Sequence, residues 1–175
     1  MTFDREKLKQ LILHVCRECR DTSKLGAIKL HKVLWYADGQ FFVRTGEAIT
    51  GETYIKHQYG PFATHLDSLM AELVNEGKLT VTKSEIHGKE KKDFIAKSDP
   101  DLSRFSDKEL LLIRDTIKNV CEDHTGTSIS EKSHDAVWDM AQMYEPIPYE
   151  ALWAARGATI TDEDIAWAKA EYGYK

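Results

Sequence analysis

The amino-acid sequence predicts a mainly α-helical α+β domain, with about six helices and one small antiparallel β-hairpin. Apolar residues recur at helical spacing over most of the chain, and two β-prone runs separated by a glycine turn follow residue 78. The 175 residues contain only four prolines and no Gly/Ser-rich linker. We therefore expect residues 1–175 to form a single compact domain.

The first helix is expected over residues 4–20, where charged residues separate apolar ones at helical spacing. The second, within residues 26–46, has apolar residues on more than one face, which is typical of a central helix with several neighbours. Residues 47–61 contain turn-forming glycines, including the Gly60-Pro61 pair, and predict a short extended link. The third helix is expected over residues 62–76.

The β-hairpin is predicted within residues 79–97, with strands over residues 79–86 and 93–97 and a polar turn that contains Gly88. The next helix should begin at Ser106, because Glu109 follows it at the spacing of a capping box.

Two further helices are predicted toward the C-terminus. The first is a shorter helix over residues 127–141, with Ala136, Val137 and Met140 facing inward. The second is a terminal helix over residues 161–172, where acidic residues follow Thr161 at the positive helix end.

The charge of the chain is unevenly distributed. Residues 1–97 carry a net charge of +3, whereas residues 98–175 carry −8. This asymmetry can indicate a nucleic-acid surface beside an acidic region, or an acidic patch that meets a basic partner. Ordinary solvated faces are the more common cause. No stretch approaches the roughly 18 apolar residues of a membrane span, and the first ten residues lack the apolar run of a secretion signal. We therefore expect a cytoplasmic protein without a membrane partner.

Cysteine and histidine residues offer one candidate metal site. Cys16 and Cys19, together with Cys121 and His124, form two pairs with zinc-ligand spacing. The same cysteines continue the apolar stripes of two predicted helices, which favours buried reduced thiols. We expect no metal and no other cofactor.

The consecutive residues Ser133, His134 and Asp135 supply the residue types of a hydrolytic triad. A triad needs side chains that converge from separate positions, whereas three neighbours on a helix point in different directions. His134 and Trp138 lie four residues apart and are expected to pack together instead. The sequence also lacks the nucleotide-binding and metalloprotease motifs, so we expect no enzyme.

A DNA-binding protein is the alternative class, because helices followed by a hairpin have a winged-helix-like order. In this interpretation residues 62–76 would enter the major groove, yet they include Asp67, Glu72 and Glu76 and no Lys or Arg. Such a helix would repel phosphates, which argues against a nucleic-acid partner. The lysine-rich hairpin fits phosphates better, although lysines also protect edge strands from aggregation.

Three segments together resemble one family. They are KLHKVLWYAD (29–38), ITGETYIKHQYGPF (49–62), and SEKSHDAVW with EPIPYE within residues 130–150. The most specific feature is the order Ile-Thr-Gly, Tyr and Gly-Pro after a Lys-Leu-x-Lys helix. Over about residues 27–150 the chain is similar to the Panacea domain, the SocA-like antitoxin domain that also occurs in phage-associated proteins. The helices at 4–20 and 161–172 would flank this core.

The resemblance implies an antitoxin that neutralises a protein toxin, usually encoded by a neighbouring gene, through direct protein–protein binding. One family member also acts as an adaptor that delivers its toxin to a AAA+ protease. A DNA-binding regulator of phage or toxin–antitoxin origin is the alternative. Because Tyr and Trp often anchor interfaces, we expect Tyr59, His134 and Trp138 to bind the partner, with packing as the competing role. The acidic second half would suit a basic toxin surface.

Overall fold

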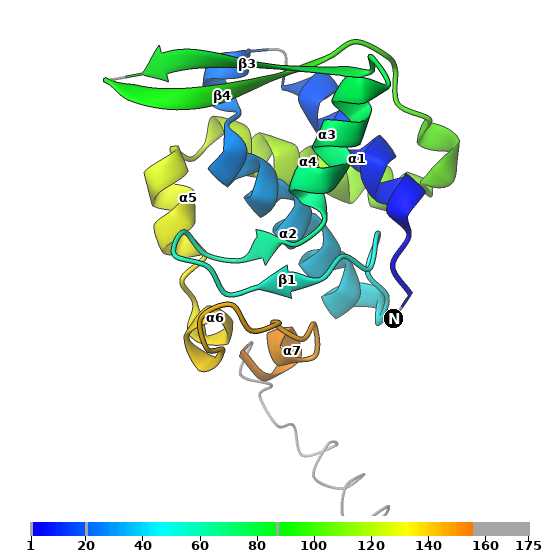
Figure 1. Cartoon of the computed structure of the whole chain (residues 1–175). Coiled ribbons are helices and arrows are strands. Elements are labelled where there is room, and N and C mark those ends of the chain that lie inside the picture. The colour runs from blue at the N-terminus through cyan, green and yellow to red at the C-terminus, as the bar shows by residue number, and fades with distance from the viewer. Residues whose placement is uncertain (1, 20, 87, 156–175) are drawn as a thin grey trace, which may run out of the picture.

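One long helix, α2, runs through the middle of the structure, and the other elements pack around it (Figure 1). The computed structural model describes residues 2–19, 21–86 and 88–155. Within that part of the chain the α-helices are α1 (Arg5–Glu18), α2 (Ala27–Thr45), α3 (Leu66–Asn75), α4 (Asp107–Glu122), α5 (Gly126–Lys132), α6 (Ala136–Met140) and α7 (Ala151–Ala155). The strands are β1 (Tyr54–Ile55), β2 (Phe62–Ala63), β3 (Leu79–Ile86) and β4 (Lys89–Ala96). The mainly helical α+β class is confirmed.

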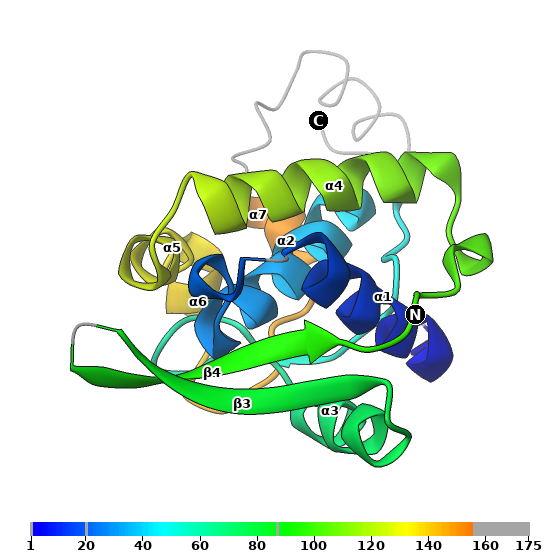
Figure 2. The same ribbon diagram turned by 90° about the horizontal axis from the view of Figure 1, so that it is seen from above.

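The helices form layers. Figure 2 shows α4 on one side of α1 and α2, with α3 and the β3–β4 hairpin on the other. The apolar residues of α2 account for its central place, since the side chains of Leu30, Val33, Leu34 and Ala37 have no exposed area. Helices α6 and α7 lie at the end of the molecule opposite the hairpin (Figure 1).

Local sequence signals explain several helix ends. The capping box of α4 is present: the Ser106 backbone N–H donates to a Glu109 carboxylate oxygen at 2.7 Å, and the Glu109 N–H donates to the Ser106 hydroxyl at 3.3 Å. Helix α1 begins after Asp4, whose carboxylate accepts the Lys7 N–H. Gly46 ends α2 with a φ of 80°, a left-handed conformation that favours glycine.

The expected start of the third helix is wrong. Residues Phe62 and Ala63 form β2, which pairs with β1 in the antiparallel register Tyr54↔Ala63, and α3 begins only at Leu66. The Ala63 N–H also donates to the ring Nδ1 of His31 at 3.1 Å. Pairing across the Gly-Pro turn therefore overrides the helical spacing that follows Pro61.

The expected helix over residues 127–141 is divided in two. It breaks at Ser133, whose buried hydroxyl donates to the Ser130 carbonyl at 2.7 Å, and Asp135 then begins α6 by accepting the Trp138 N–H. The β3–β4 hairpin is confirmed, although β4 starts at Lys89 instead of residue 93. The predicted helix over residues 161–172 lies outside the described residues.

A buried carboxylate, Asp38, ties α2 to the link that follows it. Its Oδ1 accepts the Thr50 N–H at 2.7 Å, and its Oδ2 accepts the hydroxyls of Thr50 at 2.6 Å and Tyr54 at 2.8 Å. Burial raises the pKa of Asp38 to about 6 although these hydrogen bonds oppose the shift. The carboxylate therefore fixes the link in place through three donors.

The segment after α6 is attached to the same link. The Ile147 N–H donates to the Tyr54 carbonyl at 2.8 Å, and the Lys56 N–H donates to the Glu145 carbonyl at 3.0 Å. The Tyr149 hydroxyl also donates to the Glu52 carbonyl at 2.8 Å. Residues 144–149 thus run alongside β1.

Removing the Asp38 carboxylate should destabilise the fold. We expect Asp38→Ala to lower the free energy of unfolding by about 2–4 kcal/mol, because three donors at a fully buried position lose their acceptor. Urea denaturation measures this loss. The control is Asp115→Ala on the exposed face of α4, which should change stability by less than about 0.5 kcal/mol. Equal effects of the two substitutions would contradict the role of Asp38.

Candidate partner-binding surface

Large exposed apolar side chains gather at one end of the molecule. Met140 and Tyr144 are 70% and 67% exposed, and Met143 and Trp153 are also exposed. We call these four residues the α6–α7 face, because they come from α6, the turn after it, and α7 (Figure 1). The expectation that Met140 faces inward is wrong, because α6 is a single short turn that buries only Val137. Clustered exposed apolar side chains are typical of an interaction surface.

The backbone at Tyr144 is unusual. Among the described residues Tyr144 alone, apart from glycines, has a positive φ, at 69°. Its N–H donates to the Lys56 carbonyl at 2.9 Å, and its ring lies 5.8 Å from that of His57. A left-handed conformation is costly for a residue with a Cβ, and such strain is often found at functional sites. Here it accompanies an exposed aromatic side chain.

The α6–α7 face lies within an acidic stretch of sequence. Residues 133–153 contain four carboxylates and no Lys or Arg. Asp139, Glu145 and Glu150 are exposed, and Asp135 is half-buried. The Lys56 ammonium reaches this region from the β1 side and lies 4.0 Å from the centre of the Trp138 ring. A negative rim around apolar side chains suits a partner with a basic surface.

Two of the three predicted contact residues meet in the structure. The rings of His134 and Trp138 stack with centroids 4.0 Å apart and an interplanar angle of 15°. The Trp138 indole N–H also donates to the His57 carbonyl at 3.1 Å, so the ring braces the link between β1 and β2. Tyr59 lies in that link and is 51% exposed, which leaves its ring available to a partner.

Sequence reasoning missed the contribution of Met140 and Met143 to this surface. The signal available for them was weak, since methionine at helical spacing usually predicts a core position. Tyr144 and Trp153 belong to the aromatic residues that the helical stripes do not all need, and the sequence therefore already offers them as interface candidates.

A buried lysine supports the turn that carries Tyr59. Lys32 of α2 is 2% exposed, and its ammonium donates to the Pro61 carbonyl at 2.9 Å. Gly60 has a φ of 92°, and a Cβ at that position would lie 2.1 Å from the Ser133 hydroxyl and 2.6 Å from the Lys32 nitrogen. Only glycine fits between these two groups. Burial lowers the pKa of Lys32 to about 7.

The candidate triad residues have separate structural roles. Ser133 is fully buried and bonded to Ser130, while His134 stacks on Trp138 and Asp135 caps α6. On α3, the acidic Glu72 pairs with Arg5 and Lys9 of α1. Helix α3 contains no Lys or Arg. It therefore lacks the basic side chains with which a DNA-recognition helix contacts phosphates and bases.

The cysteines and the histidine of the candidate zinc pairs lie in different surroundings. Cys16, Cys19 and Cys121 are free and buried. His124 instead lies 3.2 Å from the Ser128 hydroxyl and 3.2 Å from the Lys132 nitrogen. Across the described ranges no group of three or more His, Cys, Asp or Glu residues could hold a metal ion.

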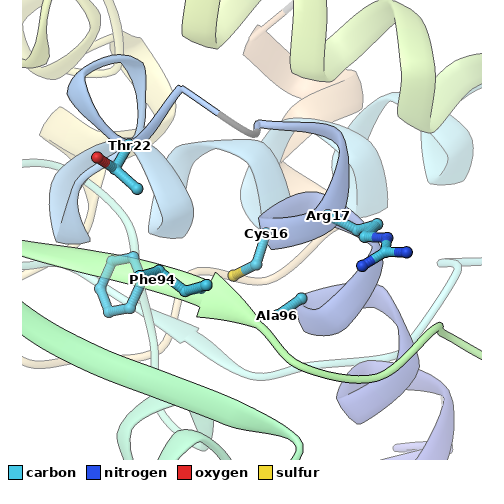
Figure 3. A pocket seen from close by; sticks show the side chains of 6 residues that line it. Cys16, Arg17, Thr22, Phe94 and Ala96 are labelled. Atoms are coloured by element: carbon cyan, nitrogen blue, oxygen red, sulfur yellow. The ribbon is translucent and has the colours of Figure 1, made fainter.

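Cys16 instead lines a cavity of about 360 Å³ between the end of α1 and β4. Figure 3 shows its sulfur pointing toward the strand, beside Phe94 and Ala96. Burial raises the pKa of Cys16 to about 12, so its thiol is a poor nucleophile.

Stability should depend on pH through Lys32. Between about pH 7 and pH 9 the unfolded chain keeps a proton on this lysine that the folded chain loses, so stability rises with pH. Urea denaturation measures the free energy of unfolding at each pH. We expect this free energy to rise between pH 7 and pH 9 by about 2 kcal/mol more for the native chain than for Lys32→Met. The control is Lys118→Met, at an exposed position of α4. Its free energy of unfolding should differ from that of the native chain by the same amount at every pH. If the plots of unfolding free energy against pH are parallel for the native chain and Lys32→Met, the pKa of Lys32 is not lowered in the folded chain.

Comparisons with known proteins agree with the resemblance in the sequence. Among the described residues, no helix combines the length and the apolar character needed to cross a membrane. Searches of curated proteins and of solved structures gave no match. A model of the family described as antitoxin SocA-like, Panacea domain, matches residues 30–139, from α2 to α6 and thus more than half of the chain. The chain therefore belongs to the SocA-like antitoxin family with a Panacea domain.

Proposed function

We propose that the protein neutralises a toxin, encoded by a neighbouring gene, by binding it directly. The family match over residues 30–139 carries this proposal, because it assigns a general antitoxin role to most of the described fold. Neutralisation of this kind requires binding and no chemistry by the antitoxin.

The toxin would bind at the α6–α7 face together with the turn that carries Tyr59. Exposed Met and Tyr side chains supply apolar contact area, and Met adapts to the shape of a partner. The acidic rim formed by Asp139, Glu145 and Glu150 would cover a basic surface of the toxin, such as one that binds RNA or nucleotides. Binding there would block access of the toxin to its substrate.

His134 and Trp138 act in this proposal mainly as supports. Their stacked rings and the hydrogen bond from Trp138 to His57 hold the Tyr59 turn against α6. Tyr59 is then the residue of the three that contacts the toxin most directly.

Co-expression tests the function. A host that expresses the neighbouring reading frame should stop growing, and this protein should restore growth. The toxin level, measured on immunoblots, then separates two modes: an unchanged level supports occlusion, and a level that falls only when a AAA+ protease is present supports delivery to that protease. A harmless neighbour, or growth arrest that this protein does not relieve, would overturn the proposal. Binding of duplex DNA by this protein alone would favour the regulator alternative.

Tyr59→Ala should weaken the complex without altering the fold. We expect at least a tenfold rise in Kd, about 1.4 kcal/mol or more, because truncation removes an exposed aromatic anchor. Isothermal titration calorimetry measures the affinity, and thermal unfolding checks the fold. Leu111→Ala on α4 is the matched control, since Leu111 is 52% exposed against 51% for Tyr59, and it should leave Kd unchanged. Equal Kd values for the two variants would remove Tyr59 from the interface.

A further inference from the structure

A cavity of about 310 Å³ lies between α2, α6 and α7, next to the α6–α7 face. Its walls are largely apolar and include Trp35, Val43, Val137 and Leu152. Its size is at the small end of the roughly 300–1,000 Å³ that ligand pockets span. The cavity therefore suits one side chain of a partner better than a nucleotide.

Two polar groups in the cavity lining can form hydrogen bonds that the described residues do not supply. The Tyr36 hydroxyl is buried and has no hydrogen-bond partner among the described residues. Asp135 uses Oδ1 to accept the Trp138 N–H at 3.1 Å, which leaves Oδ2 for another donor. An unsatisfied buried hydroxyl is costly and needs an explanation in a native protein, and a bond to a partner is one such explanation.

The charged residues around the cavity indicate the charge of the side chain that it would bind. Asp135 is the first of the four carboxylates in residues 133–153, a stretch without Lys or Arg. Burial of the Tyr36 side chain, and to a lesser extent the negative charge of Asp135, raise the pKa of Tyr36, so the hydroxyl keeps its proton. A carboxylate at the edge of an apolar cavity favours a cation with an apolar stem.

Arginine fits this combination better than lysine. Its planar guanidinium can donate two hydrogen bonds to one carboxylate, and the cavity wall supplies the Asp135 carboxylate. Its aliphatic stem would lie against Val137 and Leu152.

We propose that this cavity receives one arginine side chain of the protein toxin, with the guanidinium against the Asp135 carboxylate. This inference rests on the proposed function and identifies the anchor of that interface. It also makes Tyr36 a partner-binding residue that lies outside the exposed surface.

Three variants test the cavity in the complex. Tyr36→Phe should leave the thermal stability of the free chain equal or higher, because it removes an unpartnered hydroxyl, yet weaken toxin binding about tenfold. Asp135→Asn keeps an oxygen that can cap α6 but loses the charge, so it should weaken binding and reduce its salt dependence. Ala136→Phe, at an exposed lining position, should fill the cavity and abolish tight binding.

The control is Glu131→Gln, an exposed carboxylate of α5 that does not line the cavity; it should leave affinity unchanged. If the native chain binds and neutralises the toxin while the three cavity variants bind as tightly as the native chain, the arginine proposal is overturned and the proposed function stands.

A small probe tests the cavity without the toxin. Propylguanidinium, titrated into the free full-length chain, should give saturable NMR shifts at Val137 and Leu152, with a midpoint in the millimolar range. The neutral isostere propylurea should not produce such shifts, and Ala136→Phe should abolish the shifts that propylguanidinium causes. Absence of shifts with propylguanidinium, or equal shifts with propylurea, would refute a cation site. Probe binding combined with unimpaired toxin binding by the variants would overturn the proposal in favour of a small cationic ligand.

Discussion

The fold depends on one buried carboxylate. Asp38 has no exposed area, and it accepts three hydrogen bonds from Thr50 and Tyr54 in the link after α2. A buried acidic group is tolerated only where such donors replace water. The carboxylate therefore requires the link to lie against the central helix, and the link in turn provides β1. Glu52, also fully buried, adds a second set of bonds to Thr64 and His65.

The candidate surface is built on this link. Backbone hydrogen bonds join Tyr54 to Ile147 and Lys56 to Glu145, so the segment between α6 and α7 follows β1. Tyr144 reaches its left-handed conformation because its N–H is held by the Lys56 carbonyl. The backbone that carries the exposed apolar residues is therefore already held by hydrogen bonds in the free chain. Less conformational entropy of this segment is lost when a partner binds.

The sequence predicted those features that depend on neighbouring residues. Examples are the capping box of Ser106 and Glu109, the glycine end of α2 and the hairpin around Gly88. It could not predict features that depend on distant contacts. Strand β2 replaces the start of a helix because Ala63 pairs with Tyr54, and Met140 is exposed because Asp135 restarts the helix for one turn only. At the surface, the sequence predicted the contact between His134 and Trp138, whereas the cavity arises where α2 meets α6 and α7, which lie far from α2 in the sequence.

Hydrogen–deuterium exchange of the chain, free and in complex with the toxin encoded beside it, tests the account most directly. If the toxin binds where we propose, backbone amides in residues 54–62 and 136–153 should exchange more slowly in the complex, and the β3–β4 hairpin should be unaffected. Protection confined to α3 and the hairpin would place the partner on the other end of the molecule and contradict the account (Figure 1).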